Sequence, residues 1–177
     1  MSNQIHFGSL RPLKTRLTEL VIELSEHGKG HLEDIPHTAD EYRLQVEFGY
    51  SEPEIDGEML TWHLRHRIAL TTPEDKAVPN NRYDRLSIEV TSLFAVPASL
   101  PSQFFDVRLG QAAMSMQNQM LRSHLSFITN NFAGGDFVLP PLNAGLAHLK
   151  EIAEKLAEAL LQVREAGPPE ASTNSSN

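Results

Sequence analysis

The strongest constraint in this sequence is a two-residue hydrophobic period that appears in four segments of the first half of the chain. In residues 42–50 every even-numbered position is apolar or aromatic, as in a strand with one buried face. The same alternation appears in residues 17–24, 59–70 and 85–96, and turn-forming residues separate the segments. The later connections are short and carry no helical pattern, so neighbouring strands should pair antiparallel. We therefore expect one four-stranded antiparallel sheet.

The second half of the chain changes to a helical period. Ser102 is a suitable N-cap for a helix over residues 103–131, where apolar residues recur every three or four positions. Gly134-Gly135 follows this pattern, as glycines commonly do at helix C-termini. Asn143 is a suitable cap for a second helix, which Gly167 and two prolines would end. Strands followed by two C-terminal helices predict an α+β fold.

The composition is that of an ordinary globular protein, with 40% hydrophobic and 21% charged residues in a chain of 177. We expect an N-terminal extension over residues 1–14, a single domain over 15–166 and a disordered tail over 167–177. No apolar run approaches the roughly 18–20 residues that span a bilayer. The N-terminus lacks the apolar segment of a secretory signal. These features predict a soluble, cytoplasmic protein without membrane insertion.

Net charge and cysteine content exclude several classes of site. The formal net charge of −8 disfavours binding to nucleic acid, which requires lysine and arginine concentrated on one face. The chain has no cysteine, which excludes disulfides, thiolate metal sites and cysteine nucleophiles. No phosphate-binding loop and no nucleophile elbow occurs in the sequence.

The eight histidines do not predict a metal or catalytic site. His63 and His66 are three residues apart on an expected strand, so they point to opposite faces and cannot share an ion. His66 interrupts the apolar face of its segment, as Ser92 does in the fourth one. His124 and His148 occur singly on expected helices. We expect no catalytic residue, no metal and no cofactor; an enzyme would need a deep polar pocket around His63 or His124.

An acidic cluster is expected on one face of the sheet. Glu19 and Glu23 are four residues apart and therefore share a strand face. Glu89 points away from the apolar face of the fourth strand, and would join them if the first and fourth strands were neighbours. The cluster is either a solvated sheet face or a docking surface for a basic or zinc-bearing peptide.

Two proline-containing segments, residues 93–105 and 135–143, are unusually rich in phenylalanine, leucine and valine. Such segments either cover the core or line an exposed groove for a partner. Pro140-Pro141 favours an extended backbone and removes two N–H donors, so its apolar neighbours can line a groove without offering a free strand edge. Val21 and Leu93 lie off the main apolar face, and we expect subunits to associate through that second face.

Two stretches of the sequence resemble the SecB family of protein-export chaperones. One is IEVTSLFAVPA at residues 88–98, and the other is FVLPPLN at 137–143. The order of the expected elements is similar to that family over about residues 15–160. The resemblance implies a SecB-like fold, a homo-tetramer built as a dimer of dimers, and neither enzymatic activity nor a cofactor. It also implies that the protein holds unfolded preproteins and transfers them to the translocation ATPase SecA.

The resemblance also assigns roles to residues. It implies a peptide-binding groove whose walls and floor come from the crossover, the linker to the last helix and the second strand: Phe94, Val96, Leu100, Phe104, Leu139 and Leu142 as walls, Leu44 and Val46 as floor. It places the docking site for the zinc-bearing tail of the motor at Glu19, Glu23 and Glu89. Ser87 departs from the family, which has an apolar residue there, and the proline step that the family carries before its long helix is missing from residues 122–131. These departures leave open a dedicated chaperone with one partner, such as one linked to a toxin–antitoxin system.

Overall fold

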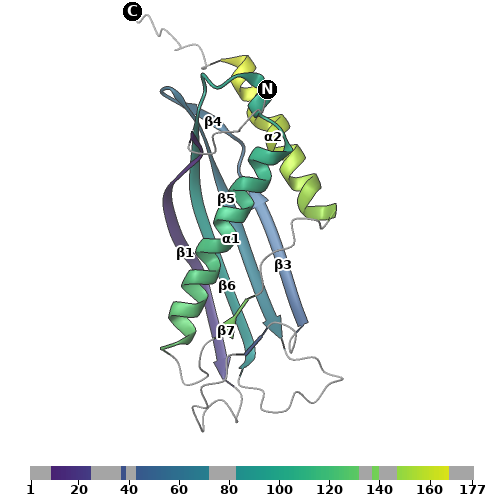
Figure 1. Ribbon diagram of the computed structural model, residues 1–177. Helices are drawn as coiled ribbons and strands as arrows, with labels where there is room; N and C mark the ends of the chain where they lie inside the picture. Colours follow the sequence, from purple (N-terminus) through teal and green to yellow (C-terminus); the bar gives the residue numbers. More distant parts are fainter. Residues whose placement is uncertain are drawn as a thin grey trace, which may run out of the picture.

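The computed structural model describes residues 9–24, 37–38, 43–71, 83–131, 137–139 and 147–167 (Figure 1). Five strands of this part of the chain form one antiparallel sheet. Four of them lie in the order β1-β6-β5-β3, and the short β4 pairs with the start of β5, on the same edge of β5 as β3. Their bounds are β1 (Arg11–Leu24), β3 (Arg43–Tyr50), β4 (Glu54–Asp56), β5 (Met59–Thr71) and β6 (Tyr83–Pro97). Two helices follow, α1 (Val107–Thr129) and α2 (Ala147–Ala166). The α+β class and the antiparallel sheet with two C-terminal helices are confirmed.

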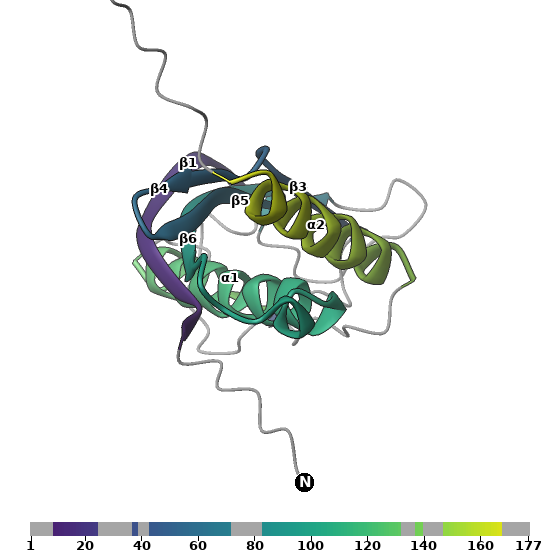
Figure 2. The ribbon, with the colours of Figure 1, turned by 90° about the horizontal axis from the view of Figure 1, so that it is seen from above.

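Both helices lie on the same face of the sheet, which we call the inner face (Figures 1 and 2). α1 contacts β5 and β6, whereas α2 contacts β3, β4 and β5. The two-residue period explains this arrangement, because alternate residues of β5 and β6 are buried beneath the helices. His66 is fully buried on the inner face and His63 is exposed on the outer face. The prediction that these two imidazoles point apart is confirmed.

The buried apolar residues form two separate clusters. The first cluster lies between α2, the N-terminal half of α1 and one half of the sheet: Leu10, Leu60, Trp62, Leu64, Phe94, Val96, Phe105, Leu109, Ala113, Met114, Leu149, Ala153, Leu156 and Leu160. The second lies under the C-terminal half of α1: Ile68, Leu70, Tyr83, Leu86, Ile88, Val90, Leu121, Leu125, Phe137 and Leu139.

Polar residues separate the two clusters on each element that runs through both. His66 lies between Leu64 and Ile68 on β5, Ser92 between Val90 and Phe94 on β6, and Gln117 between Met114 and Leu121 on α1. We call these three residues the polar seam. The Gln117 side-chain amide donates to the carbonyl oxygens of Val90 (2.7 Å) and Leu64 (3.2 Å), which attaches α1 to both central strands.

The strand and helix boundaries differ from the sequence pattern in three places. β1 begins at Arg11 and Leu10 is buried in the first cluster, so residues 11–14, which we expected in an extension, belong to the sheet. Its first residues are mostly exposed, so no alternation marks them. The expected turn at residues 52–58 contains the short strand β4, which pairs with β5 across a turn at Gly57. The positive φ of 60° at Gly57 favours glycine there.

The first helix starts later than expected. Ser102 opens a 3-10 helix over Ser102–Phe104 instead, because the following Phe105 side chain is buried in the first cluster. α1 then begins at Val107 with Asp106 as its N-cap, where a carboxylate oxygen accepts a hydrogen bond from the Arg108 N–H at 2.9 Å. α2 ends before Gly167, whose φ is 74°. The expected glycine stop at 134–135, the cap at Asn143 and the tail after Gly167 lie outside the described residues.

Replacing Asp106 by alanine is expected to lower the free energy of unfolding by about 1 kcal/mol, because the first turn of α1 loses its cap. The Asp106–Arg108 ion pair is lost as well, but Arg108 is more than half exposed and surface pairs contribute little. Urea denaturation measures the loss. Asp106→Asn keeps the capping oxygen, so a similar loss in that variant would show that the charge and not the cap stabilises the helix.

Candidate functional site

The residues that the resemblance assigns to a peptide groove do not share one exposed surface. Phe94 and Val96 are fully buried in the first cluster, and Leu139 is 3% exposed in the second. The others are less buried: Leu100, Phe104 and Val46 are half-buried, and Leu44 is 41% exposed at the far edge of the sheet. Leu142 lies outside the described residues. In this conformation the helices cover Phe94 and Val96, so neither side chain is available to a ligand.

A groove of about 650 Å³ does lie beside the C-terminal half of α1, between the helix and the segment 137–139. We call it the α1 groove. Its lining consists of Gln119, Arg122, Ser123, Ser126, Phe127, Asn130, Phe137 and Leu139. The helical members recur three or four positions apart and so share one side of α1. Leu139 is the only expected groove residue among them.

Phe127 is the exposed apolar side chain of this groove, and sequence reasoning missed it. It is 72% exposed, more than any other large apolar side chain in the part of the chain that the structure describes. The sequence carried a signal for it, because Phe127 lies off the stripe of Leu121, Leu125 and Ile128 that faces the sheet. A large aromatic residue off the buried stripe of a helix is a candidate contact residue.

The extended segment that we expected around residues 135–143 is partly described. β7 (Phe137–Val138) pairs parallel with β2 (His37–Thr38) in a separate two-stranded sheet. The Phe137 N–H donates to the Thr129 hydroxyl at 2.9 Å, which ties the segment to the end of α1. Phe137 and Leu139 pack on the second cluster and also line the α1 groove. The segment therefore covers the core with its buried side chains and borders a groove at the same time.

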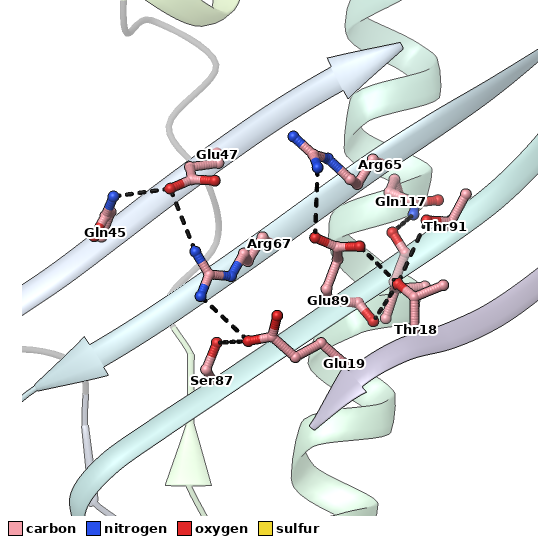
Figure 3. Close-up of polar contacts among 11 residues, drawn as sticks. Thr18, Glu19, Gln45, Glu47, Arg65, Arg67, Ser87, Glu89, Thr91 and Gln117 are labelled. Carbon is pink, nitrogen blue, oxygen red and sulfur yellow. Dashed lines mark hydrogen bonds and ion pairs between the residues drawn. The ribbon is translucent and has the colours of Figure 1, made fainter. Parts of the chain in front are cut away.

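The three acidic residues lie on the outer face of the sheet. β1 pairs with β6, so the condition for their convergence is met, and Glu19 is directly opposite Glu89. The next strands add arginine and a further acid to the same row, because Arg67 is opposite Glu89 and Glu47 is opposite Arg67. The row runs across β1, β6, β5 and β3 (Figure 3). Glu23 lies further along β1, opposite Arg85.

Each acid of the row has a basic partner. One guanidinium nitrogen of Arg67 lies 3.2 Å from a carboxylate oxygen of Glu19. The other terminal nitrogen of the same guanidinium lies 3.6 Å from a carboxylate oxygen of Glu47. The two other pairs are longer, at 3.9 Å for both Arg65–Glu89 and Arg85–Glu23. The surface is thus a mixed-charge array and not an unbalanced acidic patch.

Ser87 explains how Glu19 is held. Its buried hydroxyl donates to a Glu19 carboxylate oxygen at 2.7 Å (Figure 3). This hydrogen bond, followed by that from Arg67, holds the pKa of Glu19 below its usual value. The serine that departs from the SecB pattern is therefore the partner of one of the expected docking residues.

No protein-family model matches the chain, and no curated protein sequence matches it. Among solved structures the chain is similar to a SecB-like chaperone of Mycobacterium tuberculosis, determined in complex with a ChAD peptide from the HigA1 antitoxin. The two are 12% identical; the match covers 77% of this chain and 92% of that one, with a TM-score of 0.37. A likeness at this level carries nothing about what this chain binds.

The described residues contain no group of three or more histidine, aspartate or glutamate side chains placed to hold a metal ion. None of the helices described is long and apolar enough to cross a membrane.

Proposed function

We propose that this chain is a non-enzymatic, chaperone-like protein of SecB type that binds unfolded or precursor polypeptides in the α1 groove. The observation that carries the proposal is the 72% exposed Phe127 ring at a groove of about 650 Å³. The buried side chains of Phe137 and Leu139 form the base of this groove, so Phe127 supplies the apolar contact that a ligand can reach. Burying an exposed phenyl ring contributes about 1.5–3 kcal/mol without reading a sequence. Such a contact suits extended polypeptides of varied composition.

The composition of the groove favours a second candidate, a chaperone with one dedicated partner. Gln119, Arg122, Ser123 and Asn130 give the lining several hydrogen-bonding groups. Polar groups in a binding site discriminate between ligands that pair with them and ligands that do not. A partner such as the antitoxin of a toxin–antitoxin system would use these contacts, whereas a general clientele would depend on Phe127.

The proposal includes a cytoplasmic homo-tetramer that takes preproteins to the export machinery. β1 is an edge strand, and Leu17 and Leu20 on it are 41% and 38% exposed. A strand edge with exposed leucines is suited to self-complementary pairing between two copies. Four chains would then assemble as two such dimers.

Glu19, Glu23 and Glu89 are the proposed docking residues for a basic or zinc-bearing tail of SecA. A basic tail would have to displace the arginines that already pair with these glutamates. Its electrostatic attraction to the glutamates would therefore be modest and sensitive to salt. Leu44 and Val46, half-buried or exposed at the β3 edge, remain proposed peptide contacts, as do Leu100 and Phe104 in the crossover.

The test is suppression of aggregation of a chemically unfolded substrate, with the mass of the protein measured by light scattering. Suppression near one substrate per tetramer is expected. Phe127→Asp should weaken it about tenfold, because one apolar contact is replaced by a charge. Ser115→Asp adds the same charge to an exposed position of α1 and should leave suppression unchanged.

A folded oligomer that suppresses nothing would overturn the general holdase and leave the dedicated partner. Undiminished suppression by Phe127→Asp would place polypeptide binding outside the α1 groove.

A further inference from the structure

A second hollow lies on the outer face of the sheet, on the side away from the helices. Its volume is about 360 Å³, and it is lined by Lys14, Arg16, Thr18, His63, Thr91 and Leu93. We call it the basic pocket. The strand register places its members in two adjacent rows: Leu93 of β6 lies between Lys14 and His63, and Thr91 lies between Arg16 and Arg65. Lys14 and Arg16 of β1 therefore lie on one side of a central strand whose contribution is apolar or hydroxylic, and His63 of β5 lies on the other side.

The hollow has a cause in the backbone of β1. The pairing of β1 with β6 shifts by one residue at Leu13 and again at Thr18, so two bulges bracket the segment that carries Lys14 and Arg16. A bulge bends its strand, increases the twist and re-aims side chains. β1 is strongly curved in both ribbon views (Figures 1 and 2). The bulges thus turn an otherwise flat sheet face into a concave one at this position.

The charges of the basic pocket are not neutralised by the part of the chain that the structure describes. Arg65, Arg67 and Arg85 on the same face each have a glutamate within 4 Å. Lys14, Arg16 and the His63 side chain have no hydrogen bond or ion pair within the described ranges. In a chain of net charge −8, an unneutralised basic pocket is suited to an anionic partner.

We propose that the basic pocket binds a short acidic segment of a partner polypeptide that carries an apolar residue among its carboxylates. Arg16 and Lys14 would bind carboxylates, for which the guanidinium fork is well matched. Leu93, half-buried at the centre of the hollow, would receive the apolar side chain.

The surroundings of the pocket favour a short acidic segment over a long polyanion. The Thr18 hydroxyl donates to a Glu89 carboxylate oxygen at 2.8 Å, and Glu89 is opposite Glu19. The acidic row therefore borders the basic pocket directly. A continuous phosphate backbone leaving the pocket in that direction would meet like charge, whereas a short peptide fits within 360 Å³ and its margins.

The test uses a fluorescein-labelled peptide of alternating glutamate and leucine, with binding followed by fluorescence anisotropy. Binding is expected at about 0.05 M salt and should weaken at about 0.5 M, where charges are screened. Lys14→Gln with Arg16→Gln should weaken binding about tenfold. Both side chains are exposed and unpaired, so the fold should be kept, which circular dichroism verifies.

The matched control is Lys150→Gln with Lys155→Gln, which removes the same charge from α2 and should not change the affinity. An equal loss in this control would show that net charge alone drives binding and would overturn the proposal. The proposal would also be overturned if an oligonucleotide of equal charge bound more tightly than the peptide at the same salt concentration. Because the basic pocket and the α1 groove lie on opposite faces of the sheet, Phe127→Asp should leave peptide binding intact, which separates this proposal from the preceding one.

Discussion

Replacing His66 by leucine is expected to stabilise the protein, by about 1 kcal/mol at pH 7 and by about 3 kcal/mol at pH 5. The imidazole is fully buried in the polar seam, stacked on Phe48 with ring centroids 4.0 Å apart. Neither of its nitrogens has a hydrogen-bond partner within the described part of the chain. Unsatisfied buried polar groups cost about 1–3 kcal/mol. This cost exceeds the roughly 0.5–1.5 kcal/mol of ring stacking that leucine would lose.

The larger effect at pH 5 comes from proton binding. Burial lowers the pKa of His66 from 6.5 to about 3. Between these values the unfolded chain binds a proton at this residue and the folded chain does not. Stability is therefore lost as the pH falls below 6.5, by about 1.4 kcal/mol per unit, which is about 2 kcal/mol by pH 5. The loss continues until the pH reaches about 3.

Urea denaturation of both proteins from pH 7 to pH 4.5 measures this difference. The range ends at 4.5 because Glu19, whose pKa is also lowered, adds a loss of the same sign below that pH. His63→Asn is the control, since it removes an imidazole from the exposed side of the same strand. Parallel stability curves for the wild-type protein and His66→Leu would contradict the assignment of the acid sensitivity to His66.

Replacing Gly110 by alanine is expected to lower the free energy of unfolding by about 1 kcal/mol. A β-carbon at this position would lie 2.7 Å from the Ala153 Cα and oxygen atoms and 2.9 Å from its Cβ. Overpacking of this kind costs about 1–3 kcal/mol. Alanine gains only about 0.8–1 kcal/mol in helix propensity over glycine. The steric cost prevails because backbone atoms cannot rotate away, so α1 and α2 must separate.

The shift of the urea midpoint measures the effect, with the exposed Ser115→Ala on the same helix as the control for propensity. The double variant Gly110→Ala with Ala153→Gly sharpens the test. Two of the three closest atoms belong to the backbone of residue 153, so removing its methyl group should not restore stability. Full restoration would show that the two methyl groups alone make the contact.

The sequence pattern identified those elements in which one face is buried and the other is not. β5 and β6 bury alternate residues beneath the helices, and both were found with boundaries correct to within two residues. Residues 11–16 of β1 are exposed on both faces except Thr15, so their strand has no hydrophobic period to detect. The start of α1 was missed because Ser102 and Asp106 are both good caps, and the burial of Phe105 decides between them.

The functional surfaces were accessible to sequence reasoning only in part. The strand period predicted that Glu19, Glu23 and Glu89 would share a face if the first and fourth strands were neighbours, and β1 does pair with β6. Their arginine partners were not predicted, because placing Arg67 in the same row requires the exact register of three strands and of the bulges in β1. An alternating pattern also cannot say whether Phe94 borders a groove or lies beneath a helix. That outcome depends on where the helices pack.

The polar seam has a consequence for how the unfolding of this protein is observed. The chain contains a single tryptophan, and Trp62 lies in the first cluster, stacked on Phe94 with ring centroids 5.8 Å apart. Its emission reports the first cluster and does not sense the second, whereas circular dichroism averages over the secondary structure around both. Coincidence of the two signals is a criterion of two-state behaviour. In this protein such coincidence would mean that the two clusters unfold together across the polar seam.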